Sequence, residues 1–244
     1  MKYALVLKGA ISRTAAYGRY GDMSVSKTTE GFVDYKLCHE SINKHVILAN
    51  SNIDVFIQSW SLALEEEMVK LYKPVKYNFV DDSLFESQIT EKHSTVGSRR
   101  SSTSICKSWE LAVNMVKEYQ TLRGIQYDKI LVCRPDIYYK EDVILEEYDV
   151  SNGTMWTNCP GDALRDGVDG EGGDFHFIMN QDTFLKLGNI FKDISPNFIP
   201  DWHRNEWFYV KQILKQPTKF DKFFANVNIE LIRNWEEELK KSRS

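Results

Sequence analysis

The sequence has no long hydrophobic run and no strong excess of charge of one sign. None of its apolar stretches approaches the roughly 18 to 20 residues that a membrane-spanning helix needs. The apolar opening, residues 1–7, is short and is followed directly by Lys8 and Gly9, so we expect no signal peptide. We therefore expect a soluble, intracellular protein of the cytoplasm, without a transmembrane segment. The 31 basic and 35 acidic residues are too balanced for a nucleic-acid binder, and we expect no nucleic-acid partner.

Cysteine is scarce, and no internal repeat is evident. The four cysteines are scattered, with no C-x-x-C pair and no accompanying histidine spacing, which excludes a disulfide framework and a zinc finger; they are Cys38, Cys106, Cys133 and Cys159. We expect reduced thiols in ordinary packing. At 244 residues with 42% hydrophobic content, the chain can bury one substantial core. We expect a single domain over residues 1–244, with a nucleotide-binding half (1–140), an acceptor-side half (141–228) and a C-terminal helix or tail (229–244).

Strand-like and helical patterns alternate along the first two thirds of the chain. This order predicts an α/β fold with a mostly parallel central sheet flanked by helices, and a smaller C-terminal part. The predicted strands of this part cover residues 3–7, 53–57, 75–80 and 130–133, and the predicted helices cover 32–42 and 62–71. The clearest helix carries an apolar stripe at spacings of three and four residues, made of Ile105, Trp109, Ala112, Val116 and Tyr119.

The remaining segments give weaker signals. Residues 83–104 are polar and predict a mobile loop, and residues 161–173 form a loop rich in glycine and aspartate. Later patterns predict strands at 154–157 and 174–179, helices at 183–191 and 206–214, a turn at 200–204, and a charged helix at 229–244.

The segment K-I-L-V-C-R-P-D-I-Y-Y-K, residues 129–140, is the most informative in the chain. Its apolar run predicts a strand covered on both faces, and Arg134, Pro135 and Asp136 follow where that strand should end. An isolated R-P-D is most simply a surface salt bridge. In open α/β folds, however, ligands bind at the carboxyl ends of the strands, so the two charges are candidates for chemistry.

Other polar residues follow the other predicted strands. If the first four strands are parallel, one sheet edge collects Lys8 and Gly9, Gln58 to Trp60, Asp81 and Asp82, and Arg134 with Asp136. Such an edge suits a nucleotide. Phosphate charge could be neutralised by Lys8, Arg13, Arg19, Arg99 and Arg100, and a base could stack on Tyr17 or Trp60. Taken singly, each of these residues is more simply a solvated surface group.

Asp136 is also a candidate metal ligand. A carboxylate beside a diphosphate commonly holds a divalent cation that bridges phosphate oxygens. His203 could add a ligand from the C-terminal part, which would favour Mn²⁺ over Mg²⁺ because imidazole is the softer donor. The simpler interpretation of His203 is a surface or packing residue between Trp202 and Arg204.

In the order of these parts, the chain resembles the nucleotide-sugar-dependent glycosyltransferases of GT-A fold. It is most similar to small viral and bacterial transferases in which R-P-D stands in place of the usual D-x-D. Four motifs carry the resemblance: I-D-V-F-I-Q-S-W at 53–60, S-W-E-L-A-V-N-M-V at 108–116, Y-D-K-I-L-V-C-R-P-D-I-Y-Y at 127–139 and G-G-D-F-H-F-I-M at 172–179. Together they extend over most of residues 1–215.

The resemblance implies a GT-A-like (Rossmann-like) fold and a sugar transfer from a nucleoside-diphosphate sugar, most often a UDP-sugar, to a hydroxyl of a glycan or glycoconjugate. This is the chemistry of hexosyl- and pentosyltransferases and of polysaccharide biosynthesis. It also implies Mn²⁺ or Mg²⁺ held through Asp136. The chain departs from the family at Arg134, where an acidic residue is usual. Arg134 would then neutralise phosphate or brace Asp136.

An inverting transferase also needs a carboxylate as general base. Asp174 and Glu206 are the two candidates, with Asp174 narrowly preferred; Asp174 could instead bind acceptor hydroxyls, and Glu206 could be an exposed first-turn carboxylate. The aspartates of the glycine-rich loop, Asp162, Asp166 and Asp169, suit acceptor hydroxyls. Two other functions compete. One is a nucleotidyltransferase that makes nucleotide sugars; such enzymes usually carry a glycine-rich signature with a basic residue directly after the first strand, and residues 4–13 of this chain, A-L-V-L-K-G-A-I-S-R, match it poorly. The other is a noncatalytic nucleotide- or glycan-binding module.

Overall fold

The structure is a computed structural model of the chain. It describes residues 1–9, 11, 34–96, 100–159, 175–194, 210, 213–215, 218–224 and 229–231. The predictions for residues 161–173 and 200–204 lie outside these ranges, as does most of the predicted helix at 206–214. The division of the domain into two halves stays a prediction.

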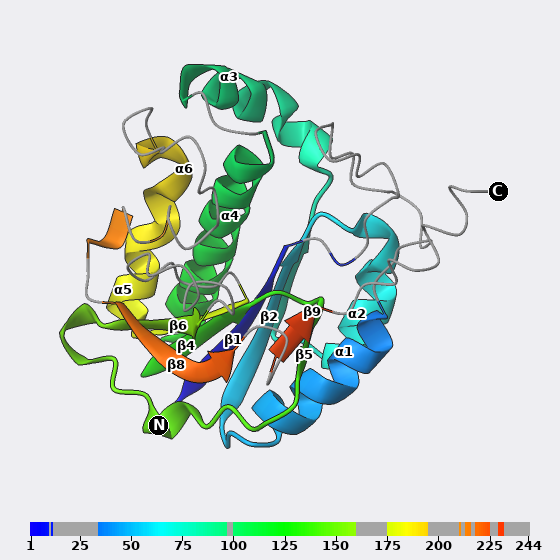
Figure 1. The fold of residues 1–244 in the computed structure, drawn as a ribbon. Coiled ribbons are helices and arrows are strands. Elements are labelled where there is room, and N and C mark those ends of the chain that lie inside the picture. Colours follow the sequence, from blue (N-terminus) through cyan, green and yellow to red (C-terminus); the bar gives the residue numbers. More distant parts are fainter. Residues whose placement is uncertain are drawn as a thin grey trace.

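A seven-stranded sheet in the order β3-β2-β1-β4-β7-β6-β8 forms the centre of the molecule (Figure 1). The strands are β1 (Tyr3–Lys8), β2 (Ile53–Ser59), β3 (Lys76–Phe79), β4 (Lys129–Cys133), β6 (Met155–Cys159), β7 (His176–Met179) and β8 (Thr218–Phe224). The neighbours from β3 to β4 are parallel, β6 and β8 are parallel, and β7 is antiparallel to both of its neighbours. The prediction of a mostly parallel central sheet flanked by helices is confirmed.

Helices cover both faces of this sheet. On one face lie α1 (Tyr35–Ile42), which continues as a π-helical turn over Asn43–Ile47, and α2 (Glu65–Tyr72); on the other lie α4 (Arg100–Arg123), α5 (Gln181–Lys186) and α6 (Ile190–Asp193) (Figure 1). The helix α3 (Glu86–Val96) packs on α4. No helix in the described ranges is both long enough and apolar enough to cross a membrane.

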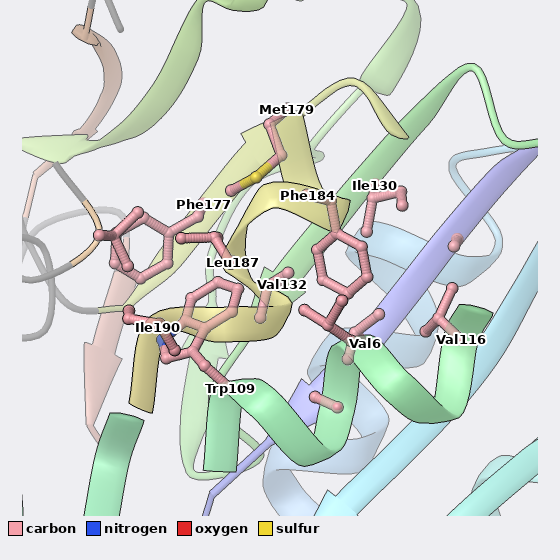
Figure 2. Close-up of a cluster of buried hydrophobic side chains, with 14 of the residues drawn as sticks. Val6, Trp109, Val116, Ile130, Val132, Phe177, Met179, Phe184, Leu187 and Ile190 are labelled. Carbon is pink, nitrogen blue, oxygen red and sulfur yellow. The ribbon is translucent and has the colours of Figure 1, made fainter. Parts of the chain in front are cut away.

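The core between the sheet and α4 is built around Trp109. Figure 2 shows its indole among Phe177, Phe184, Leu187 and Ile190, and the ring centroids of Trp109 and Phe177 are 5.5 Å apart. The predicted stripe of α4 is confirmed, because Trp109, Ala112 and Val116 are fully buried in this core and Ile105 and Tyr119 are partly buried against it.

The second core lies between the sheet and α1 with α2. It contains alternate residues of the same strands, including Leu5 and Leu7 of β1, because successive side chains of a strand point to opposite faces. Cys38, Cys106 and Cys133 are buried and form no disulfide, as expected.

The predicted loop at 83–104 is wrong. It contains a short 3-10 helix (Asp82–Phe85), the helix α3 and the first turns of α4. The serines and the two arginines of this segment suggest a loop by composition, but Ile89 and Thr103 are buried and fix the helices against the fold. Packing overrides weak local propensity here.

The predicted helix at 229–244 is wrong at its beginning. Residues Ile229–Leu231 form β9, which pairs antiparallel with β5 (Ile137–Tyr139). Strand pairing with a distant segment replaces the local helical tendency. Neither β5 nor β8 was predicted from the sequence.

The predicted helix at 183–191 is interrupted. A short 3-10 turn, Leu187–Asn189, separates α5 from α6. Gly188 in that turn lies close to α4, since a Cβ atom added to it would be 3.2 Å from Val113 Cγ1. A larger residue at this position would crowd the side chain of Val113.

Candidate functional site

The carboxyl ends of β1, β2 and β4 meet at one edge of the sheet. The register pairs Lys8 with Gln58, and Leu7 with Cys133. Because Leu7 and Cys133 are paired on adjacent strands, the residues that follow them, Lys8 and Arg134, lie at the same level of the sheet. The edge predicted from the sequence therefore exists for these three strands, and we call Lys8, Gln58, Arg134 and Asp136 the strand-end group.

Gly9 shapes the first turn at this edge. Its φ of +115° lies in a region that residues with a Cβ atom rarely adopt, and its N–H donates to the carbonyl of Gln58 at 3.0 Å. A glycine here lets the chain leave β1 while remaining tied to the end of β2.

Lys8 places a positive charge on the α4 side of this edge. The side chain is buried, and its Nζ lies 4.9 Å from the ring centroid of Trp109. An ammonium over an indole ring is stabilised by the ring quadrupole. The ammonium of Lys8 thus lies against the indole of α4, next to the end of β1.

Gln58 is a fully buried amide with an incomplete set of partners. Ser108 of α4 donates a hydrogen bond to its Oε1, and its Nε2 has no hydrogen-bond partner within the part of the chain that the structure describes. A buried donor without an acceptor costs about 1–3 kcal/mol, so it usually has a reason. Oε1 is engaged by Ser108, and Nε2 is left to donate.

Arg134 and Asp136 form a two-point ion pair. Arg134 Nε donates to Asp136 Oδ1 at 2.8 Å, and Nη2 donates to Oδ2 at 2.6 Å. The side chain of Asp136 is 1% exposed and that of Arg134 is 18% exposed. The backbone N–H of Arg134 donates to the carbonyl of Phe175 at 3.2 Å, which holds the turn against the start of β7. The pair is therefore not the loose surface salt bridge of the simplest interpretation.

Burial governs the chemistry of the cysteine beside this pair. It raises the pKa of Cys133 to about 12; a hydrogen bond from Tyr139 opposes the rise, and the negative charge of Asp136 adds to it. Cys133 is therefore a protonated, inert thiol and not a nucleophile.

The strand-end group does not by itself fit a divalent metal. Both oxygens of Asp136 accept hydrogen bonds from Arg134, and the described ranges contain no group of three or more histidine, cysteine or acidic side chains that could hold a metal ion. Metal ions of this class require several oxygen ligands, and a guanidinium held against the same carboxylate repels them. His203 lies outside the described ranges, so its pairing with Asp136 through Mn²⁺ or Mg²⁺ stays a prediction.

Trp60 and Asp81 have local roles at the same edge. Trp60 is buried and meets Phe85 edge to face at 6.1 Å between ring centroids. Asp81 begins the short 3-10 helix, where its carboxylate accepts the N–H of Ser83 at 3.0 Å. A role for either residue in nucleotide binding stays a prediction.

Several predicted residues lie outside the described ranges. They are the phosphate-binding candidates Arg13, Arg19 and Arg99, the stacking candidate Tyr17, the loop aspartates Asp162, Asp166 and Asp169, both base candidates Asp174 and Glu206, and the metal candidate His203. Arg100 begins α4, but its side chain is not described. Their roles remain predictions.

Two groups of supporting residues were not predicted. Ser108 holds the amide of Gln58, and its signal in the sequence is a hydroxyl next to the apolar stripe of α4. Ser41 holds β5: its Oγ donates to the carbonyl of Tyr139 at 2.8 Å and accepts the N–H of Tyr139 at 2.6 Å. The ring of Tyr139 stacks on His176, with Oη 3.1 Å from Nδ1. These contacts join segments far apart in the chain, which no local pattern indicates.

No protein-family model and no curated protein matches the chain. Among solved structures, mouse xyloside xylosyltransferase 1 is similar with a TM-score of 0.48 and 10% identity, over 90% of this chain and 84% of that chain. The nucleoside-diphosphate-sugar pyrophosphorylase from Vibrio cholerae RC9 has a TM-score of 0.46 and 12% identity, over 99% and 100%. The glycosyltransferase GlyE of Streptococcus pneumoniae TIGR4 has a TM-score of 0.43 and 10% identity, over 91% of this chain but only 45% of GlyE. These values assign no family to the chain.

Proposed function

We propose that the protein is a glycosyltransferase that moves a sugar from a nucleoside-diphosphate sugar to a hydroxyl of a glycan or glycoconjugate. The observation that carries the proposal is the strand-end group, which places two cations and an unpaired amide N–H at the carboxyl edge of three parallel strands. Ligands of open α/β folds bind at this edge, and cations there suit phosphate oxygens. The resemblance of four sequence motifs to those of GT-A glycosyltransferases supplies the choice of reaction.

In this reaction the acceptor oxygen forms a bond to the anomeric carbon, and the bond from that carbon to the diphosphate breaks. Negative charge develops on the leaving diphosphate. Lys8 and Arg134 supply positive charge where that group would lie, and fixed charges of this kind stabilise a transition state more than mobile water does. The acceptor proton goes to a base, for which Asp174 and Glu206 stay the candidates.

A donor panel tests the proposal. The purified chain, incubated with UDP- and GDP-sugars in the presence of Mn²⁺, should slowly release the nucleoside diphosphate by hydrolysis. Lys8→Met keeps an unbranched side chain beside Trp109 but removes the charge, so it should lower this release at least tenfold. The matched control is Lys44→Met, because Lys44 is an exposed lysine of the π-helical turn.

The same assay separates the competing functions. Pyrophosphate formed from a nucleoside triphosphate and a sugar phosphate would identify a nucleotidyltransferase. Donor binding without turnover, in the presence of a broad acceptor panel, would identify a binding module. If no donor binds, with or without a divalent cation, the proposed function is refuted.

A further inference from the structure

The two charges of the R-P-D turn are placed differently with respect to solvent. The carboxylate of Asp136 is at the buried end of the ion pair and the guanidinium of Arg134 is at the more exposed end, 1% against 18%. The dipole of the pair therefore points its positive end outward. An anion that approaches this edge meets the guanidinium before the carboxylate.

Both oxygens of the buried Asp136 carboxylate are hydrogen-bonded to Arg134. A charged group taken out of water is tolerated only when it is paired and hydrogen-bonded, and Asp136 receives two charge-assisted bonds of 2.8 and 2.6 Å from Arg134. A divalent cation on the same oxygens would have to displace that guanidinium. The geometry thus gives Asp136 the role of fixing the plane and position of Arg134.

Lys8 and Gln58 end strands at the same edge of the sheet as Arg134. Lys8 ends the strand next to the one that leads to Arg134, and Gln58 is the register partner of Lys8 on the far side of β1. Gln58 has its Oε1 engaged by Ser108, so its Nε2 can only donate. Two cations and one donor at a single edge suit anionic oxygens.

We infer that the anionic part of the ligand is bound by the side chains of Arg134 and Lys8 without a divalent metal, and that Asp136 is a positioning residue for Arg134. This rests on the proposed function, since the anionic part is then the diphosphate of the donor. It assigns Asp136 a different role from the metal ligand that the sequence suggested. The charge that a metal would contribute comes from the chain itself.

The test measures binding of UDP, GDP and inorganic pyrophosphate by calorimetry, in EDTA and in excess Mn²⁺ or Mg²⁺. The unaltered protein should bind at least one of these probes in EDTA, with a Kd within about threefold of that in the metal, a difference well under the 1.4 kcal/mol of a tenfold change. Arg134→Gln alone would leave a buried carboxylate unpaired and could unfold the protein. We therefore compare Asp136→Asn with the double variant Arg134→Gln/Asp136→Asn, in which neither buried charge is left alone.

The two assignments predict opposite results. If Arg134 is the contact, Asp136→Asn binds the probe in EDTA and the double variant binds at least tenfold more weakly. As a positioning residue, Asp136 should affect turnover more than binding, so Asp136→Asn should lower kcat with a smaller change in KM. Arg123→Gln, at the end of α4, is the matched control for loss of an arginine and should bind normally.

Three outcomes would overturn the inference. Binding that requires the metal and is lost in Asp136→Asn would make Asp136 a metal ligand and leave the proposed function standing. Equal metal-free binding by Asp136→Asn and the double variant would remove Arg134 as the contact. Failure of every probe and every sugar donor to bind under any condition would refute the proposed function as well.

Discussion

Asn50 is a buried amide that joins two segments of the chain. Its Nδ2 donates to the carbonyls of Val46 and Val143, and its Oδ1 accepts the N–H of Leu145, each at 2.7 Å. Every partner is a backbone group that has to be satisfied inside the protein. Asn50 therefore fixes the chain that follows β5 against the end of the π-helical turn.

Asn50→Ala should lower the free energy of unfolding by about 3 kcal/mol, because it leaves buried backbone groups without partners at about 1–3 kcal/mol each. Urea unfolding followed by circular dichroism measures the change. Asn114→Ala is the control, since Asn114 is exposed on α4 and its replacement should change stability by less than about 0.5 kcal/mol. Equal effects of the two substitutions would show that the hydrogen bonds of Asn50 contribute nothing specific.

His39 makes stability depend on pH near neutrality. It meets Tyr72 edge to face at 4.6 Å between ring centroids, and burial lowers its pKa below the ordinary value. The unfolded chain takes up this proton near pH 6.5, whereas the folded protein does so only at a lower pH. Stability contributed by neutral His39 is thus present above about pH 6.5 and is lost as the pH falls toward the lowered pKa.

His39→Gln should remove this part of the acid sensitivity. Thermal midpoints at pH 8 and pH 5.5 should differ less in the variant than in the unaltered protein. The carboxylates are common to both proteins, so their contribution cancels in the comparison. An identical drop in both proteins would show that His39 titrates as it does in the unfolded chain.

At the scale of elements, the sequence predicts best where a segment has a strong pattern of its own. The first four strands and the stripe of α4 are confirmed because burial on one or both faces imposes a period that can be seen locally. The strands β5 and β9 could not be predicted from the sequence. Each has only three residues, and each is stabilised by pairing with the other, some ninety positions away in the chain. The predicted loop before α4 fails for the same reason, since tertiary packing fixes it.

Part of the candidate site could be predicted from the sequence in the same way, and part could not. Lys8, Gln58 and Arg134 could be placed at one edge because strand ends follow from strand positions. The direction of the ion pair could not, because Arg134 and Asp136 are two residues apart in a turn and only the fold decides which of them is buried.

Trp109 is the residue through which α4 is anchored to the sheet. Trp109→Ala should lower the free energy of unfolding by about 3–5 kcal/mol, because it removes a fully buried ring from contact with Phe177 and leaves a cavity. Leu122→Ala on the same helix is the control: Leu122 is 79% exposed and its loss should cost less than about 0.5 kcal/mol. Urea midpoints give both values. A loss below 1 kcal/mol for Trp109→Ala would mean that the helix is held mainly by other contacts.

At the scale of the whole molecule, the C-terminal part is tied to the candidate site by β9. Its register pairs Ile137 with Leu231 and Tyr139 with Ile229, and β5 begins directly after Asp136. Tyr139 is in turn held by Ser41 and His176. The backbone that positions the ion pair is thus fixed on one side by α1 and β7 and on the other by β9.

Two truncations separate the contribution of this pairing from that of the residues beyond it. Ending the chain after Leu231 keeps β9, whereas ending it after residue 228 removes β9 and opens the edge of β5. Each lost backbone hydrogen bond contributes about 1 kcal/mol, so the shorter chain should melt at least about 5 °C below the longer one. Its affinity for UDP should also fall at least tenfold, because Asp136 and Arg134 lose a fixed backbone. If the two truncations bind UDP equally while only the shorter one melts early, β9 stabilises the fold without positioning the site.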